Sequence, residues 1–505
     1  MVWVVGVLLL AWMAWGPVVL VLAAGALCVP RLRWWVLDRI YVSRQVAVRT
    51  AGAVALLVAV VVVVPDGWLP IPPAPGIWAA PSYVGRPASP QAITSELPPN
   101  PQLSTVPATS RPGPLGLQPD VETAWFGLQR CGRLEVTSTD LLLALCHDRS
   151  GPALRLVDPE SMRPRATKDL PASDDRAACP GDALYLDVQD RAVVATTDRN
   201  VLAVRTSTDE GKDKGGDALR TETTWDLKPY VPFGDCVVAL APDWSGRVWW
   251  ASGKGLVGTI APESGDVRVL DLAEDVEHGF ATDPDGGVLL ATDEAVHRLG
   301  AGSDGVPQVT WTAATEHASG TAPVLVDGGA VAVTDTSKDQ LSVVFLRRGT
   351  GEEVCREAVF GKGKGAVDAD LAPVGPGVVV TNDHDYSSPR STLLGFTSSP
   401  GVARVDLVGD ACAEQWTSEQ VVPGSGAVAS WPNGLVYAWT KRPSLLGVSA
   451  WYVTGIDAQT GRSMWSVRAG TGLLAGSDGS RPALGPDGSL WMGTLSGLVR
   501  VTDRS

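Results

Sequence analysis

The densest group of residues able to do chemistry is the run Asn382-Asp383-His384-Asp385-Tyr386. Carboxylates and imidazoles are ligands that divalent metals accept, which makes Asp383, His384 and Asp385 candidate metal ligands. Adjacent residues of a strand point to opposite faces, however, so consecutive residues do not easily coordinate one ion together. We interpret the run as a solvated loop between strands and expect no catalytic metal.

A second acidic run, residues 283–286 with the sequence Asp-Pro-Asp-Gly, resembles the start of a calcium-binding loop. It lacks the later glutamate of an EF-hand, and such a tetrapeptide is a common hairpin turn, which is the interpretation we adopt. The chain contains no Gly-x-Ser-x-Gly, His-Glu-x-x-His or phosphate-binding loop motif. A nucleophilic triad could still assemble from distant residues, but nothing in the sequence points to one. We therefore predict no catalytic residues and no cofactor.

The elements that carry these residues are short strands. From residue 121 onward, short apolar runs alternate with Gly, Asp and Pro turns, which is typical of an all-β fold. Repeated hairpin units with three or four strands each, spaced roughly 40 to 60 residues apart, mark the blades of a β-propeller. The units begin near Ser138, Gln189, Trp244, Pro284, Asp327, Val374, Pro432 and Pro486.

These eight units predict eight blades over residues 121–505. The strand at residues 121–127 is expected to complete the last blade, closing the ring and hiding its edge. Seven blades is the alternative, because the units near Ser138 and Gln189 are degenerate. Strand-like units also hold many of the 19 tryptophans, which we interpret mainly as packing residues between blades. They are Trp249, Trp250, Trp311, Trp416, Trp439, Trp451, Trp465 and Trp491.

Residues 451–465 run strand, Asp, small residues, Thr-Gly and a strand with Trp465, and residues 483–497 are similar. In this pattern they resemble the repeat of quinoprotein-like propellers, the pyrroloquinoline-quinone (PQQ) type, over roughly residues 130–505. Dehydrogenases of that family use a disulfide between adjacent cysteines and a Glu/Asn/Asp calcium site. This chain has no adjacent cysteines, so the resemblance implies the blade and not the cofactor. The Ala-, Val-, Gly- and Arg-rich composition also resembles that of high-GC bacteria, such as actinobacteria.

Six of the seven cysteines lie beyond the hydrophobic N-terminus, an even number that allows 15 pairings. Propeller blades contact mainly themselves and their neighbours, so sequential pairing is favoured. No Cys-x-x-Cys motif is present, which disfavours zinc and thioredoxin-like chemistry. The expected disulfides are Cys131–Cys146, Cys179–Cys236 and Cys355–Cys412.

The N-terminus is hydrophobic. Residues 1–29 carry no charge and are long enough to cross a bilayer, with a kink expected at Pro17. A second apolar segment follows, which reaches spanning length when Arg49 and Trp68 are placed at the two interfaces. We predict transmembrane helices at about 2–29 and 49–66.

The alternatives for the first segment are a cleaved signal peptide and a lipoprotein signal at Cys28. No basic residue precedes Arg31 and Leu27 precedes the cysteine, so we favour a retained helix. The segment at 30–48 holds most of the nearby arginines and is predicted to be a cytoplasmic loop. Residues 1–65 then form a multi-pass membrane hairpin, and the C-terminal domain lies outside the cytoplasm.

Between hairpin and propeller, residues 66–120 form a Pro-rich extracytoplasmic linker. Fifteen prolines between Pro65 and Pro119 favour extended polyproline II, which predicts a semi-rigid spacer, although part of it could lie along the domain. Residues 66–505 hold 36 basic and 54 acidic residues, a net charge of −18. Such a surface repels phosphate backbones and disfavours nucleic acid as a partner.

Two classes of function remain. The first is a membrane-tethered binding or scaffold propeller that contacts an envelope protein or glycan, and the missing catalytic motifs favour it. The second is an envelope hydrolase or lyase with a carboxylate or metal site at the propeller mouth.

Overall fold

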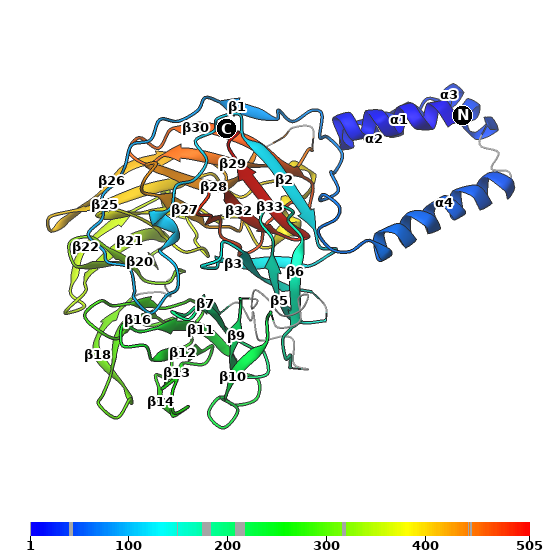
Figure 1. The fold of residues 1–505 in the computed structure, drawn as a ribbon. Coiled ribbons are helices and arrows are strands. Elements are labelled where there is room, and N and C mark those ends of the chain that lie inside the picture. The colour runs from blue at the N-terminus through cyan, green and yellow to red at the C-terminus, as the bar shows by residue number, and fades with distance from the viewer. Residues whose placement is uncertain are drawn as a thin grey trace.

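The apolar runs and their Gly, Asp and Pro turns form eight separate antiparallel sheets in the described part of the computed structural model (Figure 1). The prediction of eight blades is therefore confirmed over the seven-bladed alternative. The structure describes residues 2–39, 44–148, 150–173, 183–207, 218–315, 320–442, 444 and 447–504.

Each blade runs along the chain from an inner strand at the channel to an outer strand at the rim. Blades one to four contain β3 (Arg130–Val136), β4 (Leu142–His147), β5 (Pro152–Val157) and β6 (Pro164–Asp169); β7 (Leu184–Leu186), β8 (Arg191–Ala195), β9 (Asn200–Arg205) and β10 (Thr221–Asp226); β11 (Val237–Pro242), β12 (Val248–Ser252), β13 (Leu256–Ile260) and β14 (Val267–Asp271); and β15 (Ala281–Thr282), β16 (Val288–Ala291), β17 (Ala295–Ala301) and β18 (Pro307–Ala314).

The later blades repeat this arrangement. Blades five to eight contain β19 (Val324–Val326), β20 (Ala330–Ser337), β21 (Gln340–Arg347) and β22 (Glu353–Ala358); β23 (Ala372–Val374), β24 (Gly377–Thr381), β25 (Val402–Val408) and β26 (Ala411–Ser418); β27 (Ala427–Ser430), β28 (Leu435–Arg442), β29 (Ala450–Asp457) and β30 (Ser463–Thr471); and β31 (Ala483–Leu484), β32 (Leu490–Thr494), β33 (Gly497–Thr502) and β2 (Asp120–Trp125). Short 3-10 helices are η1 (Ala108–Ser110) and η2 (Pro389–Gly395).

The ring is closed by β2, which pairs antiparallel with the last strand from Asp120↔Thr502 to Trp125↔Gly497. This confirms that the strand preceding the repeats completes the last blade. Closure of this kind protects the edge that the last blade would otherwise expose. The eight predicted unit starts all fall on or directly beside the turn between the first and second strands of a blade.

The core lies within and between the blades. Middle strands are buried on both faces, whereas outer strands such as β6 alternate half-buried and exposed positions because only one face is partly covered. The eight strand tryptophans are all buried, as expected for packing residues. Trp250 lies opposite Gly258 in register, and a Cβ at that glycine would collide with the indole ring. Glycine is therefore required there for the tryptophan to lie flat across the sheet.

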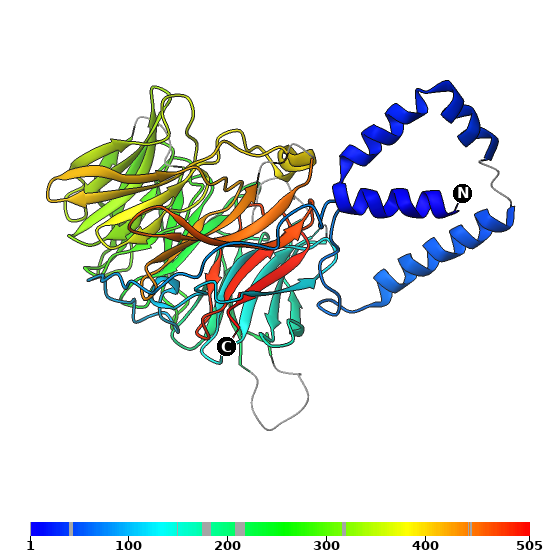
Figure 2. The same cartoon turned by 90° about the horizontal axis from the view of Figure 1, so that it is seen from above.

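The N-terminal helices project from one side of the propeller in both views (Figures 1 and 2). They are α1 (Val2–Trp15), α2 (Pro17–Leu27), α3 (Pro30–Arg39) and α4 (Arg44–Val63). The expected kink at Pro17 is a break, because Gly16 adopts φ 66° and the proline occupies the first turn of α2, where its missing N–H costs nothing.

The sequence predicts that two of these N-terminal segments cross the membrane. Within the described ranges, no single helix is long and apolar enough to cross a membrane. One bent pair, Val18–Leu27 and Pro30–Val36, passes by length and composition, with 100° between its halves.

The Pro-rich segment packs along the propeller. Its first part adds β1 (Tyr83–Gly85) to the outer strand β30 as a fifth strand of the seventh blade. Residues 86–117, which we call the strap, then cross the face formed by the turns between first and second strands. Ser95 Oγ and Glu96 N donate to Asp327 at 2.8 Å each.

The strap continues over further blades and returns. The Asn100 side chain donates to Pro242 O at 3.0 Å, and Leu103 forms a bridge with Asp187. On the way back, Arg111 donates to Leu484 O at 2.9 Å. The segment that composition alone describes as a spacer is thus a fixed cover on one face of the propeller.

The end of the strap is held by Asp503, which accepts backbone N–H groups from Leu115, Gly116 and Leu117 at 2.6, 3.0 and 2.8 Å. Replacing Asp503 with alanine is expected to free this end. Hydrogen bonds to charged groups contribute roughly 1.5–3 kcal/mol each, and solvation of the released amides leaves an expected loss of about 2 kcal/mol. Limited proteolysis between residues 104 and 117 should then be faster.

The matched control for this experiment is Asp120→Ala. Asp120 pairs with Arg504 at 3.2 Å in an exposed ion pair, which contributes little to stability. Its loss should leave the proteolysis rate of the strap unchanged. A strap that stays as resistant in Asp503→Ala as in the wild-type chain would show that Asp503 does not hold it.

Candidate functional site

The candidate site lies at the channel mouth on the face opposite the strap. Because the strands of a blade are antiparallel, loops from second to third strand and loops from one blade to the next all emerge on this side. We call it the open face. The run that the sequence singled out lies here, in the loop between β24 and β25.

The three candidate metal ligands do not converge. Asp383 is buried and accepts N–H groups from Gly424 at 2.9 Å and Asp368 at 3.3 Å. Asp385 is exposed; it accepts the Ser399 hydroxyl at 2.7 Å and lies 3.2 Å from Nδ1 of His384. Asp383 thus faces the interior, whereas His384 and Asp385 pair with each other in a turn nearer the surface. In the described part of the chain, no group of three His, Cys, Asp or Glu residues is arranged to hold a metal.

The Asp383 carboxyl instead lies beside residues of the loops that connect neighbouring blades. Burial raises the pKa of Asp383 to about 7, and the nearby carboxyl of Asp368 adds to the rise, while the two N–H donors oppose it. Burial also raises the pKa of Asp368, with contributions from Glu277 and Asp478 and an opposing one from His278. Both carboxyls are therefore more easily protonated than a solvated aspartate.

A histidine and a tyrosine lie beside these acids. Burial lowers the pKa of His278, so the imidazole is mostly neutral at pH 7, and its Nε2 is buried without a hydrogen-bond partner among the described residues. The Tyr386 hydroxyl donates to Asp478 Oδ1 at 3.1 Å, and burial raises its pKa. Asp478 in turn pairs with Arg130 at 2.9 Å.

This arrangement can hold and exchange protons near neutral pH, which is a property of acid–base sites and also of closed polar networks. The sequence singled out Asp383 and Tyr386 but missed His278, Asp368 and Asp478. These three occupy corresponding places, a few residues before the inner strands β15, β23 and β31. Alignment of the blades on their inner strands is the signal that could have found them.

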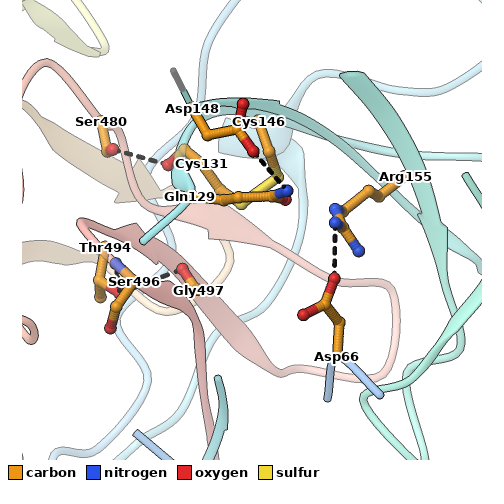
Figure 3. Close-up of a disulfide and its surroundings, with 10 residues drawn as sticks. All are labelled: Asp66, Gln129, Cys131, Cys146, Asp148, Arg155, Ser480, Thr494, Ser496 and Gly497. Atoms are coloured by element: carbon orange, nitrogen blue, oxygen red, sulfur yellow. Dashed lines mark hydrogen bonds and ion pairs between the residues drawn. A yellow bond between two sulfur atoms is a disulfide. The ribbon is translucent and has the colours of Figure 1, made fainter. Parts of the chain in front are cut away.

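Two disulfides link strands of the propeller. Cys131 and Cys146 are bonded, with Cα atoms 4.0 Å apart on the paired strands β3 and β4 (Figure 3). Cys355 and Cys412 are bonded at a Cα separation of 5.8 Å and join the outer strands of neighbouring blades. Two expected pairs are thus confirmed. Cys179, the expected partner in the third pair, lies outside the described residues.

Exposed apolar side chains also stand on the open face. Leu128 is 72% exposed in the loop that enters the first blade. Phe233, 74% exposed, and Tyr230, 42% exposed, lie in the loop that enters the third blade. The guanidinium of Arg199 is 5.8 Å from the centre of the Phe233 ring. Large apolar side chains in exposed loops are candidates for contact with a partner.

The fold and its mouth define the chain as an eight-bladed β-propeller with one face covered by its own N-terminal strap. No protein-family model matches the chain. An uncharacterised protein of Archaeoglobus fulgidus is 22% identical over 323 residues, or 54% of this chain. The chain spans 62% of the length of that relative.

Solved structures share the propeller fold. The computationally designed protein Ika8 superposes with a TM-score of 0.52 at 13% identity, over 75% of this chain and 98% of its own. BamB from Moraxella catarrhalis has a TM-score of 0.47 at 13% identity over 74% and 97% of the two chains. A catalytically inactive virginiamycin B lyase from Staphylococcus aureus, solved with quinupristin, has 0.43 at 8% identity over 76% and 99%. At these identities the likeness concerns the fold alone.

Proposed function

We propose that this chain is a membrane-tethered binding or scaffold module of the cell envelope, with its propeller outside the cytoplasm. The N-terminal apolar helices would act as the anchor, and the arginines between them would remain on the cytoplasmic side. Disulfides persist outside the cytoplasm, so the bonds Cys131–Cys146 and Cys355–Cys412 support this location. The partner would be an envelope protein rather than nucleic acid, because residues 66–505 are strongly acidic.

One observation carries the binding function: the strap covers one face, while the loops of the other face hold Leu128, Tyr230 and Phe233 out in solvent. Aromatic side chains that fill a pocket on a partner often dominate the energy of an interface. We assign Phe233 as the central anchor, because it is the most exposed of the three.

The test uses intact cells that produce the full chain with Cys28 replaced by serine. A cysteine is placed at Phe233 and carries a membrane-impermeant photo-crosslinker. The matched control is Val188→Cys, which is 49% exposed on the strap-covered face of the second blade. We expect both positions to react from outside and a discrete adduct with a partner protein to form at position 233 alone. Failure of both positions to react would contradict the location, and equal adducts would contradict the assigned face.

The enzyme alternative is favoured by one feature, the group of His278, Asp368 and Asp383 at the mouth. A neutral imidazole beside carboxyls of raised pKa is suited to general acid–base catalysis. An envelope lyase or hydrolase of this kind needs only transient contact with its substrate. The same crosslinking experiment would then yield no stable adduct at position 233.

A further inference from the structure

The connection between the last helix and the propeller is very short. Helix α4 ends at Val63, and Asp66 already pairs with Arg155 at 2.7 Å (Figure 3). Three residue steps reach at most about 10 Å. The Arg155 side chain is 5% exposed, so the bond lies at the wall of the first blade and not on a loose loop. The rim of the propeller is therefore held close to the end of α4.

The next residues hold the chain on this rim. Gly67 N donates to Trp125 O at 2.9 Å, and the guanidinium of Arg163 lies 4.0 Å from the centre of the Trp68 ring. Further on, Ala74 N donates to the Thr471 hydroxyl at 2.9 Å. Residues 64–82, which we call the tether, are thus attached to the propeller from their beginning, which leaves no free spacer after the helix.

The 3-10 helix η2 lies on the same rim. Gly395, the last residue of η2, packs closely against Gly447, since a Cβ added at Gly395 would lie 3.0 Å from the Cα of Gly447. The next residue, Val448, packs against Gly76 of the tether, where an added Cβ would collide with the valine side chain. Gly76 N also donates to Met13 O of α1 at 2.6 Å. These contacts connect η2 to the tether and to the helices, and Figure 2 shows its gold turn on the helix side of the propeller.

Large apolar side chains gather on this rim. Trp68 and Trp78 of the tether are 56% and 64% exposed, and Leu393, Leu394 and Phe396 at the end of η2 are 40%, 65% and 68% exposed. We call these five residues the apolar rim.

The backbone around η2 is fixed in spite of this exposure. The buried Lys441 ammonium donates to the carbonyls of Thr392 and Phe396, and the Ser449 hydroxyl donates to Thr392 O at 3.0 Å. Leu394 has φ 56°, a left-handed conformation that is costly for a leucine. Strain that holds an apolar side chain in solvent is typical of a functional surface.

We propose that the apolar rim rests in the interface of the lipid bilayer and sets the propeller edge-on to the membrane, an inference that rests on the proposed membrane anchor. The short tether brings the rim to the bilayer, where tryptophan and leucine side chains are favourable. Exposed Arg390 on η2 fits anionic headgroups, while the acidic Asp385 on the same loop is engaged by His384 and Ser399. The edge-on orientation leaves the open face free for a partner.

The test uses the full chain, with Cys28→Ser, in vesicles of phosphatidylcholine and phosphatidylglycerol. A cysteine at Leu394 carries an environment-sensitive fluorophore, and half of the samples contain lipid brominated on its acyl chains. The matched control is Val408→Cys, 64% exposed in the turn between β25 and β26 on the strap-covered face. A third probe at Val21 of α2, 70% exposed, reports insertion of the helices.

We expect brominated lipid to roughly halve the emission of the probes at positions 394 and 21 and to leave position 408 unchanged. Quenching at 21 without quenching at 394 would overturn the rim contact and keep the membrane anchor. Quenching at 394 and 408 alike would overturn the edge-on orientation. Absence of quenching at 21 would overturn the anchor itself, and with it this inference.

Discussion

Loss of the Cys355–Cys412 disulfide is expected to lower the free energy of unfolding by about 4 kcal/mol. The bond closes a loop of 57 residues and joins the outer strands of two neighbouring blades, β22 and β26. Without it, the unfolded chain gains the entropy of the open loop. The fifth and sixth blades would also lose the covalent link between their outer strands.

The measurement is urea unfolding of the purified full chain in detergent, comparing wild type with the double variant Cys355→Ser/Cys412→Ser. The matched control is Cys131→Ser/Cys146→Ser, which opens a loop of only 15 residues and is expected to cost about 3 kcal/mol. A larger loss in the control would show that loop closure is not the main contribution of these bonds.

Ionisation of Asp383 is expected to destabilise the propeller as the pH rises from about 4 to about 7. The pKa of this buried carboxyl is raised from 3.8 to about 7, so between these values the folded state binds a proton that the unfolded state releases. Stability falls with pH wherever the folded state binds more protons. The shift of about 3 units corresponds to about 4 kcal/mol at most, reached above pH 7.

Asp383→Asn isolates this contribution. Its free energy of unfolding relative to wild type should increase steadily from pH 4 to pH 7 and then level off, because the variant carries no charge to bury. Asp385→Asn on the same loop is the control. Hydrogen bonds from Ser399 and His384 lower the pKa of Asp385 below 3.8, so this carboxyl is ionised in both the folded and the unfolded state from pH 4 to pH 7, and its replacement should give a difference in stability that does not change over that range. A pH-independent difference between wild type and Asp383→Asn would show that this carboxyl is ionised at all these pH values.

The sequence by itself determined the number of blades and the position of their turns. Each blade is a local meander, so its Gly, Asp and Pro turns and its alternating apolar strands are written within some 50 residues. Buried Trp250 and Trp465 could be assigned to packing from the sequence as well, because a tryptophan in a short strand buries a large apolar area between blades. Cysteine spacing also sufficed for the pairs Cys131–Cys146 and Cys355–Cys412, because sequential blades are neighbours in space.

Only the tertiary structure decided which residues meet at the mouth and where the Pro-rich segment lies. His278, Asp368 and Asp478 are about a hundred residues apart in sequence and come together because the ring brings equivalent loops to one face. Prolines remove donors but keep their carbonyl acceptors, so a polyproline segment can be solvated or docked with the same composition. Docking was decided by distant partners such as Asp327 and Asp503, whose carboxylates accept the remaining N–H groups of the strap.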